Sequence, residues 1–223
     1  MKFIWPSLIV VLFFSIPSSF ASEDWKLRKN KKNIQVYTRK VEGAAIKAAK
    51  VETIVEGYSL SSLVALLMDV EACPDWADRC AESYVHEKLS ETESYVYVHN
   101  AMPYPIKDRD VLTRAKWSQD LSDYSVKLIS IAEDGILPHK KKRLRLTEAK
   151  TTWHFIPKQD GSVHIINESH VNPGSTLPAW IINALMVDAP YKTMRSFIAE
   201  ARKPKYRDAK VSFIQEPLAF QAQ

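Results

Sequence analysis

Residues 177–202 read LPAWIINALMVDAPYKTMRSFIAEAR, and apolar side chains recur through this stretch at helical spacing. The broad face that they define carries Trp180, Ile181, Ala184, Leu185, Asp188, Met194, Phe197, Ile198 and Ala201. A helix with so wide an apolar face has to be covered on that side. Pro190 is predicted to kink it, because proline lacks the backbone N–H that a helix interior needs.

The residues before this helix mostly predict strands, because they alternate or run apolar between turn signals such as Asp160-Gly161. The expected strands are 34–40, 45–56, 83–88, 93–101, 108–117, 124–132, 144–156 and 163–171. A shorter helix is expected over 59–70, with Ser59 as its cap. About eight successive strands followed by a long amphipathic helix indicate an α+β fold, in which a curved antiparallel sheet wraps around that helix.

The composition fits one globular domain, with 223 residues, 46% hydrophobic, 26% charged and a net charge of +5. Glycines are few, and the closest two, Gly161 and Gly174, lie 13 positions apart. Glycine-rich phosphate loops need two or three glycines within about eight residues, so they are excluded. The Gly-x-Ser-x-Gly nucleophile elbow is excluded for the same reason.

The first 21 residues have the pattern of a cleaved export signal. Lys2 precedes an uncharged run over 3–21, and Ser19-Phe20-Ala21 provides a small-x-small cleavage site. An uncleaved anchor is the alternative, but a spanning helix needs about 20 continuous apolar residues, and this run holds two prolines and four serines. We therefore expect a signal peptide over 1–21, a single domain over 22–223, and a periplasmic location.

Export would place Cys73 and Cys80 in an oxidising compartment, where a pair in one short loop forms a disulfide. Two reduced cysteines facing an apolar interior are the alternative. Two thiols cannot make a structural zinc site, which needs four ligands, and the six histidines include no His-x-x-x-His pair. No metal and no cofactor are expected.

Several short motifs follow one another in an order that resembles the steroidogenic acute regulatory protein-related lipid transfer (START) family. They are Trp25, IQVYTR at 34–39, Leu67-Met68-Asp69, Trp76, Pro103-Tyr104-Pro105, Arg109-Asp110, Arg145 and PGSTLPAWIIN at 173–183. The resemblance spans nearly all of residues 23–202. It implies the helix-grip fold, whose curved sheet and C-terminal helix enclose a tunnel for one hydrophobic ligand, usually a lipid or sterol.

The resemblance also implies which side chains face the tunnel. The expected ligand-binding residues are Tyr97, His99, Arg109, Thr113, Trp117, Trp180, Ile181 and Leu185. Plain core packing is the alternative for Tyr97 and Trp117, and a structural ion pair with a buried carboxylate is the alternative for Arg109. No catalytic residue is expected.

This chain departs from the family at positions that bear on the ligand. Members often carry an arginine six residues after the first residue of the Arg-Asp pair and an acid on the neighbouring strand, where this chain has Ala115 and His99. Charged residues that flank the family tryptophan are replaced by Cys73 and Ala77. A weakly polar ligand, or a headgroup left near solvent, therefore suits the chain better than a sterol-type or phosphatidylcholine-type anchor.

By resemblance, the loops 102–107 and 133–143 are candidate gates, with Pro190 a bend point for a moving lid. The second loop ends in a basic run, and Lys140, Lys141, Lys142 and Arg143 are expected to dock on an anionic membrane. A solvated basic loop is the alternative. Nucleic acid is not an expected partner, because the chain is exported and no aromatic residue interleaves the run.

The hypothesis is an exported, monomeric carrier that shields one lipid or other hydrophobic small molecule. The alternative is a helix-grip enzyme of the polyketide cyclase or hydrolase type, with His99 or His154 as a general base. Such an enzyme needs a second positioned group, and the sequence does not indicate one. A third hypothesis is a domain whose cavity has closed and which serves as a partner-binding module.

Overall fold

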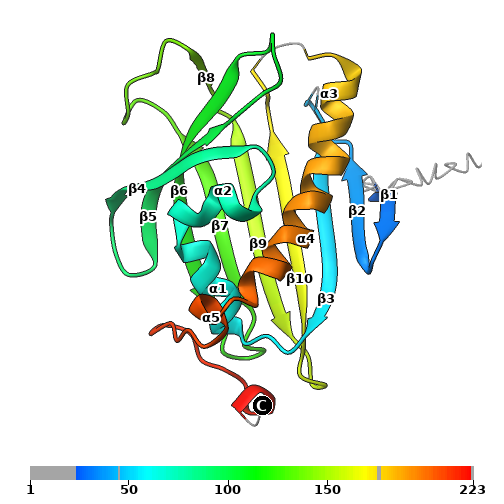
Figure 1. The fold of residues 1–223 in the computed structure, drawn as a ribbon, viewed down its shortest axis with the longest axis vertical. Coiled ribbons are helices and arrows are strands. Elements are labelled where there is room, and N and C mark those ends of the chain that lie inside the picture. Colours follow the sequence, from blue (N-terminus) through cyan, green and yellow to red (C-terminus); the bar gives the residue numbers. More distant parts are fainter. Residues whose placement is uncertain (1–23, 45, 175–176, 222–223) are drawn as a thin grey trace, which may run out of the picture.

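A curved sheet of ten strands wraps around the C-terminal helix in this computed structural model (Figure 1). The structure describes residues 24–44, 46–174 and 177–221, so the expected signal peptide over 1–21 lies outside the described residues. Within the described part, no helix is long and apolar enough to cross a membrane. The α+β helix-grip fold expected from the sequence is confirmed.

Nine strands form one path in the order β1-β2-β3-β10-β9-β7-β6-β5-β4, with antiparallel neighbours throughout. The tenth strand, β8, pairs with β6 in parallel. The strands are β1 (Lys26–Lys31), β2 (Ile34–Arg39), β3 (Ala48–Glu56), β4 (Cys80–Lys88), β5 (Glu93–Asn100), β6 (Asp108–Gln119), β7 (Val126–Glu133), β8 (Arg143–Arg145), β9 (Ala149–Pro157) and β10 (Ser162–Val171).

Two strands differ from the sequence prediction. β1 was not expected, because its residues are mostly exposed and show no alternation. It is an edge strand held by pairing with β2, and lysines are typical of edges because they discourage further pairing. The prediction of a single strand over 144–156 is wrong. β8 ends at Arg145 and β9 begins at Ala149, and between them Leu146 N donates to Asp110 O at 2.8 Å. That bond turns the chain from β8 toward β9.

The C-terminal helix comprises α3 (Ala179–Asn183), a π-helical segment η2 (Ala184–Asp188) and α4 (Ala189–Ala201). It lies diagonally across the sheet in Figure 1. Pro190 is the second residue of α4, so the irregularity expected there takes the form of a π-helical turn just before it. A π-helical turn holds more residues than an α-helical one and rotates the faces on either side of it relative to each other.

That rotation explains why part of the predicted apolar face is wrong. Trp180 is 61% exposed, and Asp188 is exposed and pairs with Lys29 at 2.6 Å. Tyr191, which the sequence pattern did not select, is buried. Beyond the turn, Met194 and Phe197 are fully buried as expected, because they pack against the sheet.

Five shorter helices complete the described part of the chain. They are α1 (Leu60–Met68), the 3₁₀ helix η1 (Val70–Ala72), α2 (Cys73–Trp76), α5 (Pro204–Arg207) and α6 (Leu218–Gln221). Ser59 caps α1 as expected, since its hydroxyl accepts a hydrogen bond from Ser62 N at 3.0 Å.

The segment after α5 returns to the body of the domain. The Glu216 carboxylate accepts hydrogen bonds from Leu60 N at 3.0 Å and Ser61 N at 2.7 Å, and so binds the free N–H groups at the start of α1. Phe213 lies against Trp117, with ring centroids 6.3 Å apart. The C-terminal segment therefore holds α1 and β6 together.

Candidate ligand-binding cavity

A cavity of about 460 Å³ lies between the concave face of the sheet and the helices. Its sheet wall consists mainly of Ser94, Val96, Val98, Asn100, Val111, Thr113, Ala115, Trp117, Leu128, Ser130, Thr151 and Trp153. Its helical wall comes from Leu67, Met68, Val70, Cys73 and Trp76. The volume falls within the range of about 300–1,000 Å³ that is usual for small-molecule sites, and apolar walls with a few hydroxyls are typical of them.

A smaller cavity of about 190 Å³ lies under α3 and η2. The helix contributes Ile182, Leu185, Met186 and Ala189, which recur at helical spacing. Asn100, Leu146 and Val171 line both cavities. The large and the small cavity are therefore neighbours that share a wall.

The expected site residues divide into two groups. Thr113 and Trp117 line the large cavity, and Arg109 and Leu185 line the small one. Their contact with a ligand remains a prediction. Ile181 is fully buried but is not part of either lining. Trp180, mostly exposed, is not part of them either.

The expectation that Tyr97 and His99 face the interior is wrong. In the register of β5 and β6, Val96 lies opposite Thr113. Side chains of paired residues share a face, and neighbours along a strand alternate. Tyr97 and His99 therefore lie on the outer face, and Val98 and Asn100 face inward. The sequence missed these residues because both faces of β5 carry apolar side chains, so alternation alone could not choose between them.

On the outer face, Tyr97 joins a buried polar network that fastens β8 to β6. Its hydroxyl donates to Asp110 Oδ2 at 2.9 Å and accepts from Arg143 Nη1 at 2.6 Å. Arg145 donates to both carboxylate oxygens of Asp110, at 3.1 and 3.2 Å. Burial is the main cause that raises the pKa of Tyr97 to about 12. Burial also acts to raise the pKa of Asp110, but the hydrogen bonds from Arg145 and Tyr97 outweigh it and hold that pKa below its ordinary value.

The two loops proposed as gates differ in position. Met102, in the loop 102–107, lines the small cavity. No described residue of the loop 133–143 lines either cavity, because Arg145 binds the carbonyl of Leu137 at 3.0 Å and holds this loop on the outer face. In the basic run, Lys140, Lys141 and Lys142 are exposed, and Lys140 Nζ lies 4.6 Å from the centroid of the Tyr97 ring. Arg143 is engaged with Tyr97 and with Glu82 at 3.1 Å.

Arg109 is 4% exposed, and its charged side chain lines the small cavity. Its Nη1 donates to the carbonyl oxygen of Lys107. Burial lowers the pKa of Arg109, against the opposing effect of Asp108, yet a guanidinium remains protonated in proteins. The fully buried carboxylate nearby, Asp110, pairs with Arg145.

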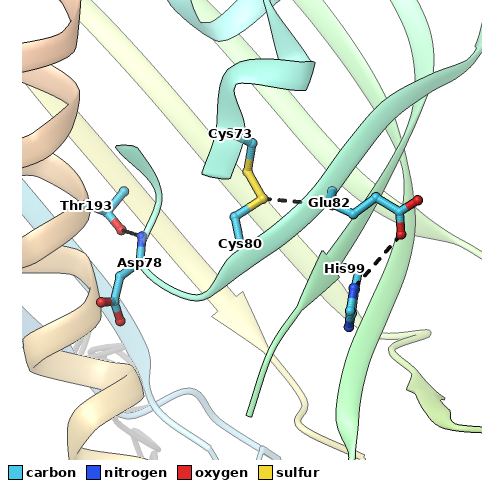
Figure 2. The surroundings of a disulfide bond; sticks show 6 residues. All are labelled: Cys73, Asp78, Cys80, Glu82, His99 and Thr193. Atoms are coloured by element: carbon cyan, nitrogen blue, oxygen red, sulfur yellow. Dashed lines mark hydrogen bonds and ion pairs between the residues drawn. A yellow bond between two sulfur atoms is a disulfide. The ribbon is translucent and has the colours of Figure 1, made fainter. Parts of the chain in front are cut away.

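The expected disulfide between Cys73 and Cys80 is present, with Cα atoms 6.0 Å apart (Figure 2). It joins α2 to the start of β4 and closes the segment 74–79. Asp78 N donates to Thr193 Oγ1 at 3.0 Å, which ties the same segment to α4, as Figure 2 shows. The segment is thus held both to the sheet and to the C-terminal helix.

None of the described histidines lines either cavity. His99 lies on the outer face, where its Nε2 is 2.8 Å from Asp108 Oδ2. His154 also lies outside both linings. Residues 24–44, 46–174 and 177–221 contain no cluster of histidine, cysteine and acidic side chains that could hold a metal ion.

A curved antiparallel sheet, a C-terminal helix packed across it and an apolar cavity between them define a helix-grip protein. The chain belongs to the START domain family, whose model matches residues 19–203. The segment that carries Phe213 and Glu216 lies beyond this match.

Similar proteins include bacterial and animal members. An uncharacterized protein of Pseudomonas aeruginosa is 26% identical over 88% of this chain and 96% of its own length. The mouse phosphatidylcholine transfer protein is 25% identical over 72% of this chain and 75% of its own. The crystal structure of a STAR-related lipid transfer protein fragment from Xanthomonas axonopodis has a TM-score of 0.72 and 27% identity. It covers 80% of this chain and 99% of that one.

Proposed function

We propose that this protein binds one lipid in its internal cavity and carries it through water. The observation that carries the proposal is the large cavity, whose walls combine valine, leucine and tryptophan side chains with isolated hydroxyls such as Thr113. Burial of an apolar chain there removes it from water, which is the main driving force for binding. The names of the mouse and Xanthomonas relatives, both lipid transfer proteins, support the same function.

A helix-grip enzyme with a tunnel histidine is less well supported. General acid–base chemistry requires the base to lie within hydrogen-bond reach of the substrate. His99 and His154 are both outside the described cavity walls. A carrier needs no such group, because shape and apolar surface are sufficient for it.

Organic extraction of the purified native protein tests the carrier directly. We expect about one lipid molecule per protein, identified by mass spectrometry, because a single cavity of this volume accepts one apolar chain or ring system. Protein stripped of lipid should take up a lipid again from vesicles. A native protein that is empty and takes up no lipid from vesicles of any composition would contradict the proposal.

We further propose that the exposed lysines Lys140, Lys141 and Lys142 hold the carrier on anionic membranes. Each basic residue near an anionic surface contributes about 1 kcal/mol. Replacing all three by glutamate should therefore weaken sedimentation with anionic vesicles by roughly 100-fold or more at low salt. A matched variant with Lys26, Lys31 and Lys32 replaced by glutamate changes the net charge equally, at exposed positions in β1 and in the turn after it. If both variants lose binding equally, net charge and not this loop is responsible.

A further inference from the structure

Two arginines from different parts of the chain line the small cavity. Arg79 precedes β4 and Arg109 lies on β6, and both belong to the lining of this cavity. Most of the remaining wall is apolar, as at Leu177, Leu185 and Met186. Two guanidinium groups in an otherwise apolar wall are unusual, because buried charge is unfavourable unless it is matched.

The backbone around Arg79 is fixed on several sides. Its φ of 69° lies in the left-handed region, which residues other than glycine rarely adopt. Cys80, directly after it, is held by the disulfide, and the preceding Asp78 N is bound to Thr193 of α4 (Figure 2). The carbonyl of Arg79 accepts a hydrogen bond from Ala101 N at 2.8 Å. A strained residue held by its surroundings in this way is a feature of functional sites.

The described lining of the small cavity holds two arginines and one carboxylate. Asp78 is the single carboxylate among the described lining residues. It lies 3.5 Å from Arg79 Nε, and its other oxygen lies 3.6 Å from Lys192 Nζ, so two cations share it. Arg79 Nε is buried and makes no hydrogen bond within the described part of the chain. Arg79 Nε is therefore a donor that can still bind an oxygen atom of a ligand.

We propose that the small cavity binds the anionic headgroup of the ligand, a carboxylate or a phosphate, between Arg79 and Arg109. This inference rests on the proposed carrier function and names its ligand class. Guanidinium groups match both anions in shape and charge. We place the apolar chain of the ligand in the large cavity, which lies next to the small one, since Asn100, Leu146 and Val171 line both. The ligand is thus a long-chain anionic amphiphile.

Three ligands with the same hexadecyl chain length separate the possible headgroups. They are hexadecanoate, hexadecyl phosphate and the neutral hexadecanol, measured by titration against lipid-free protein. We expect at least one of the two anions to bind roughly tenfold or more tightly than hexadecanol, since hydrogen bonds to charged groups contribute about 1.5–3 kcal/mol. Whichever anion binds more tightly identifies the headgroup as carboxylate or phosphate.

Variants of Arg79 assign the effect to this site. Arg79→Gln should bind the preferred anion roughly tenfold more weakly and leave hexadecanol unchanged. Arg79→Lys keeps the charge and should retain part of the preference. Arg114→Gln is the matched control, because Arg114 lies on the exposed side of β6, where it pairs with Glu93 at 2.7 Å. It should bind all three ligands as the wild type does.

Two outcomes overturn the inference and leave the carrier intact. In the first, the wild-type protein binds hexadecanol as tightly as both anions. In the second, Arg79→Gln keeps the full preference for an anion. If Arg79→Gln does not fold, the comparison of ligands on the wild type still decides the question. Failure of the wild type to bind any of the three chains, or any lipid from vesicles, overturns the carrier itself.

Discussion

Replacing Asp110 by alanine should destabilise the protein by about 3–5 kcal/mol, because it leaves the buried guanidinium of Arg145 without its carboxylate. The two side chains are 1% and 2% exposed, and the pair is joined by two hydrogen bonds. Tyr97 would lose its acceptor at the same time. The free energy of unfolding, measured by denaturant titration, gives the result directly.

The pair between Arg114 and Glu93, whose side chains are 49% and 17% exposed, provides the control for this experiment. Glu93→Ala removes a partner at 2.7 Å from an arginine whose side chain is 49% exposed. Water replaces the lost contact there, so the loss should be about 1 kcal/mol or less. Replacing Asp110 and Arg145 together by leucine and methionine should destabilise less than Asp110→Ala alone, since no unpaired charge remains. A loss below about 1 kcal/mol for Asp110→Ala would contradict the assignment of this pair as the buried fastening of β8.

The lowered pKa of Asp110 predicts the direction in which the stability of the protein changes with pH. The pKa of Asp110 is lower in the folded protein than its ordinary value, so its contribution to stability is fully present above the unfolded pKa of roughly 4. That contribution is lost as the pH falls through the folded pKa. The difference in stability between the wild type and Asp110→Asn should therefore be constant near neutral pH and shrink in acid.

Replacing Ala115 by phenylalanine should abolish most lipid uptake while the domain stays folded. Ala115 is buried, and it faces the large cavity from the middle of β6, so a ring at this position occupies ligand space. Affinity for a lipid that fills the cavity should fall by roughly tenfold or more, about 1.4 kcal/mol. The free energy of unfolding should change by less than this loss of binding free energy, because the new side chain fills empty volume and does not displace packed atoms.

Lipid extracted per mole of protein and the unfolding midpoint together check this result. Lys116→Phe is the matched control, because it places the same ring on the exposed side of the same strand. That variant should carry as much lipid as the wild type. If Ala115→Phe also carries lipid normally, the ligand does not occupy the large cavity.

The sequence predicted the fold well because its strongest signals are local. The run 177–202 repeats apolar residues at helical spacing, and α3 to α4 lie within it. On β6, charged Arg114 and Lys116 mark the outer side, so the inward face was predicted correctly. The disulfide between Cys73 and Cys80, which their short spacing and the expected export together favoured, is present.

The candidate site was predicted less well, because contacts between different strands and helices position its residues. On β5 both faces are apolar, so the direction of Val96 and Tyr97 depended on the register with β6. The π-helical turn rotates Trp180 away from the cavity side, and the apolar pattern of the sequence does not predict such a turn. Arg79 has no motif around it that indicates a cavity. Its position follows from a disulfide, a bond to Thr193 and a bond from Ala101.

By itself, the sequence determined the class of fold, the long helix and the strands that wrap around it, because side-chain periodicity reports each element's buried face. Only the tertiary structure decided which β5 residues face the cavity, that Arg145 pairs with Asp110, and that Arg79 and Arg109 line the same cavity. Those outcomes depend on hydrogen bonds and packing between residues far apart in the chain, and periodicity within one element carries no information about them. The walls of the cavity are therefore a property of the assembled sheet and helix.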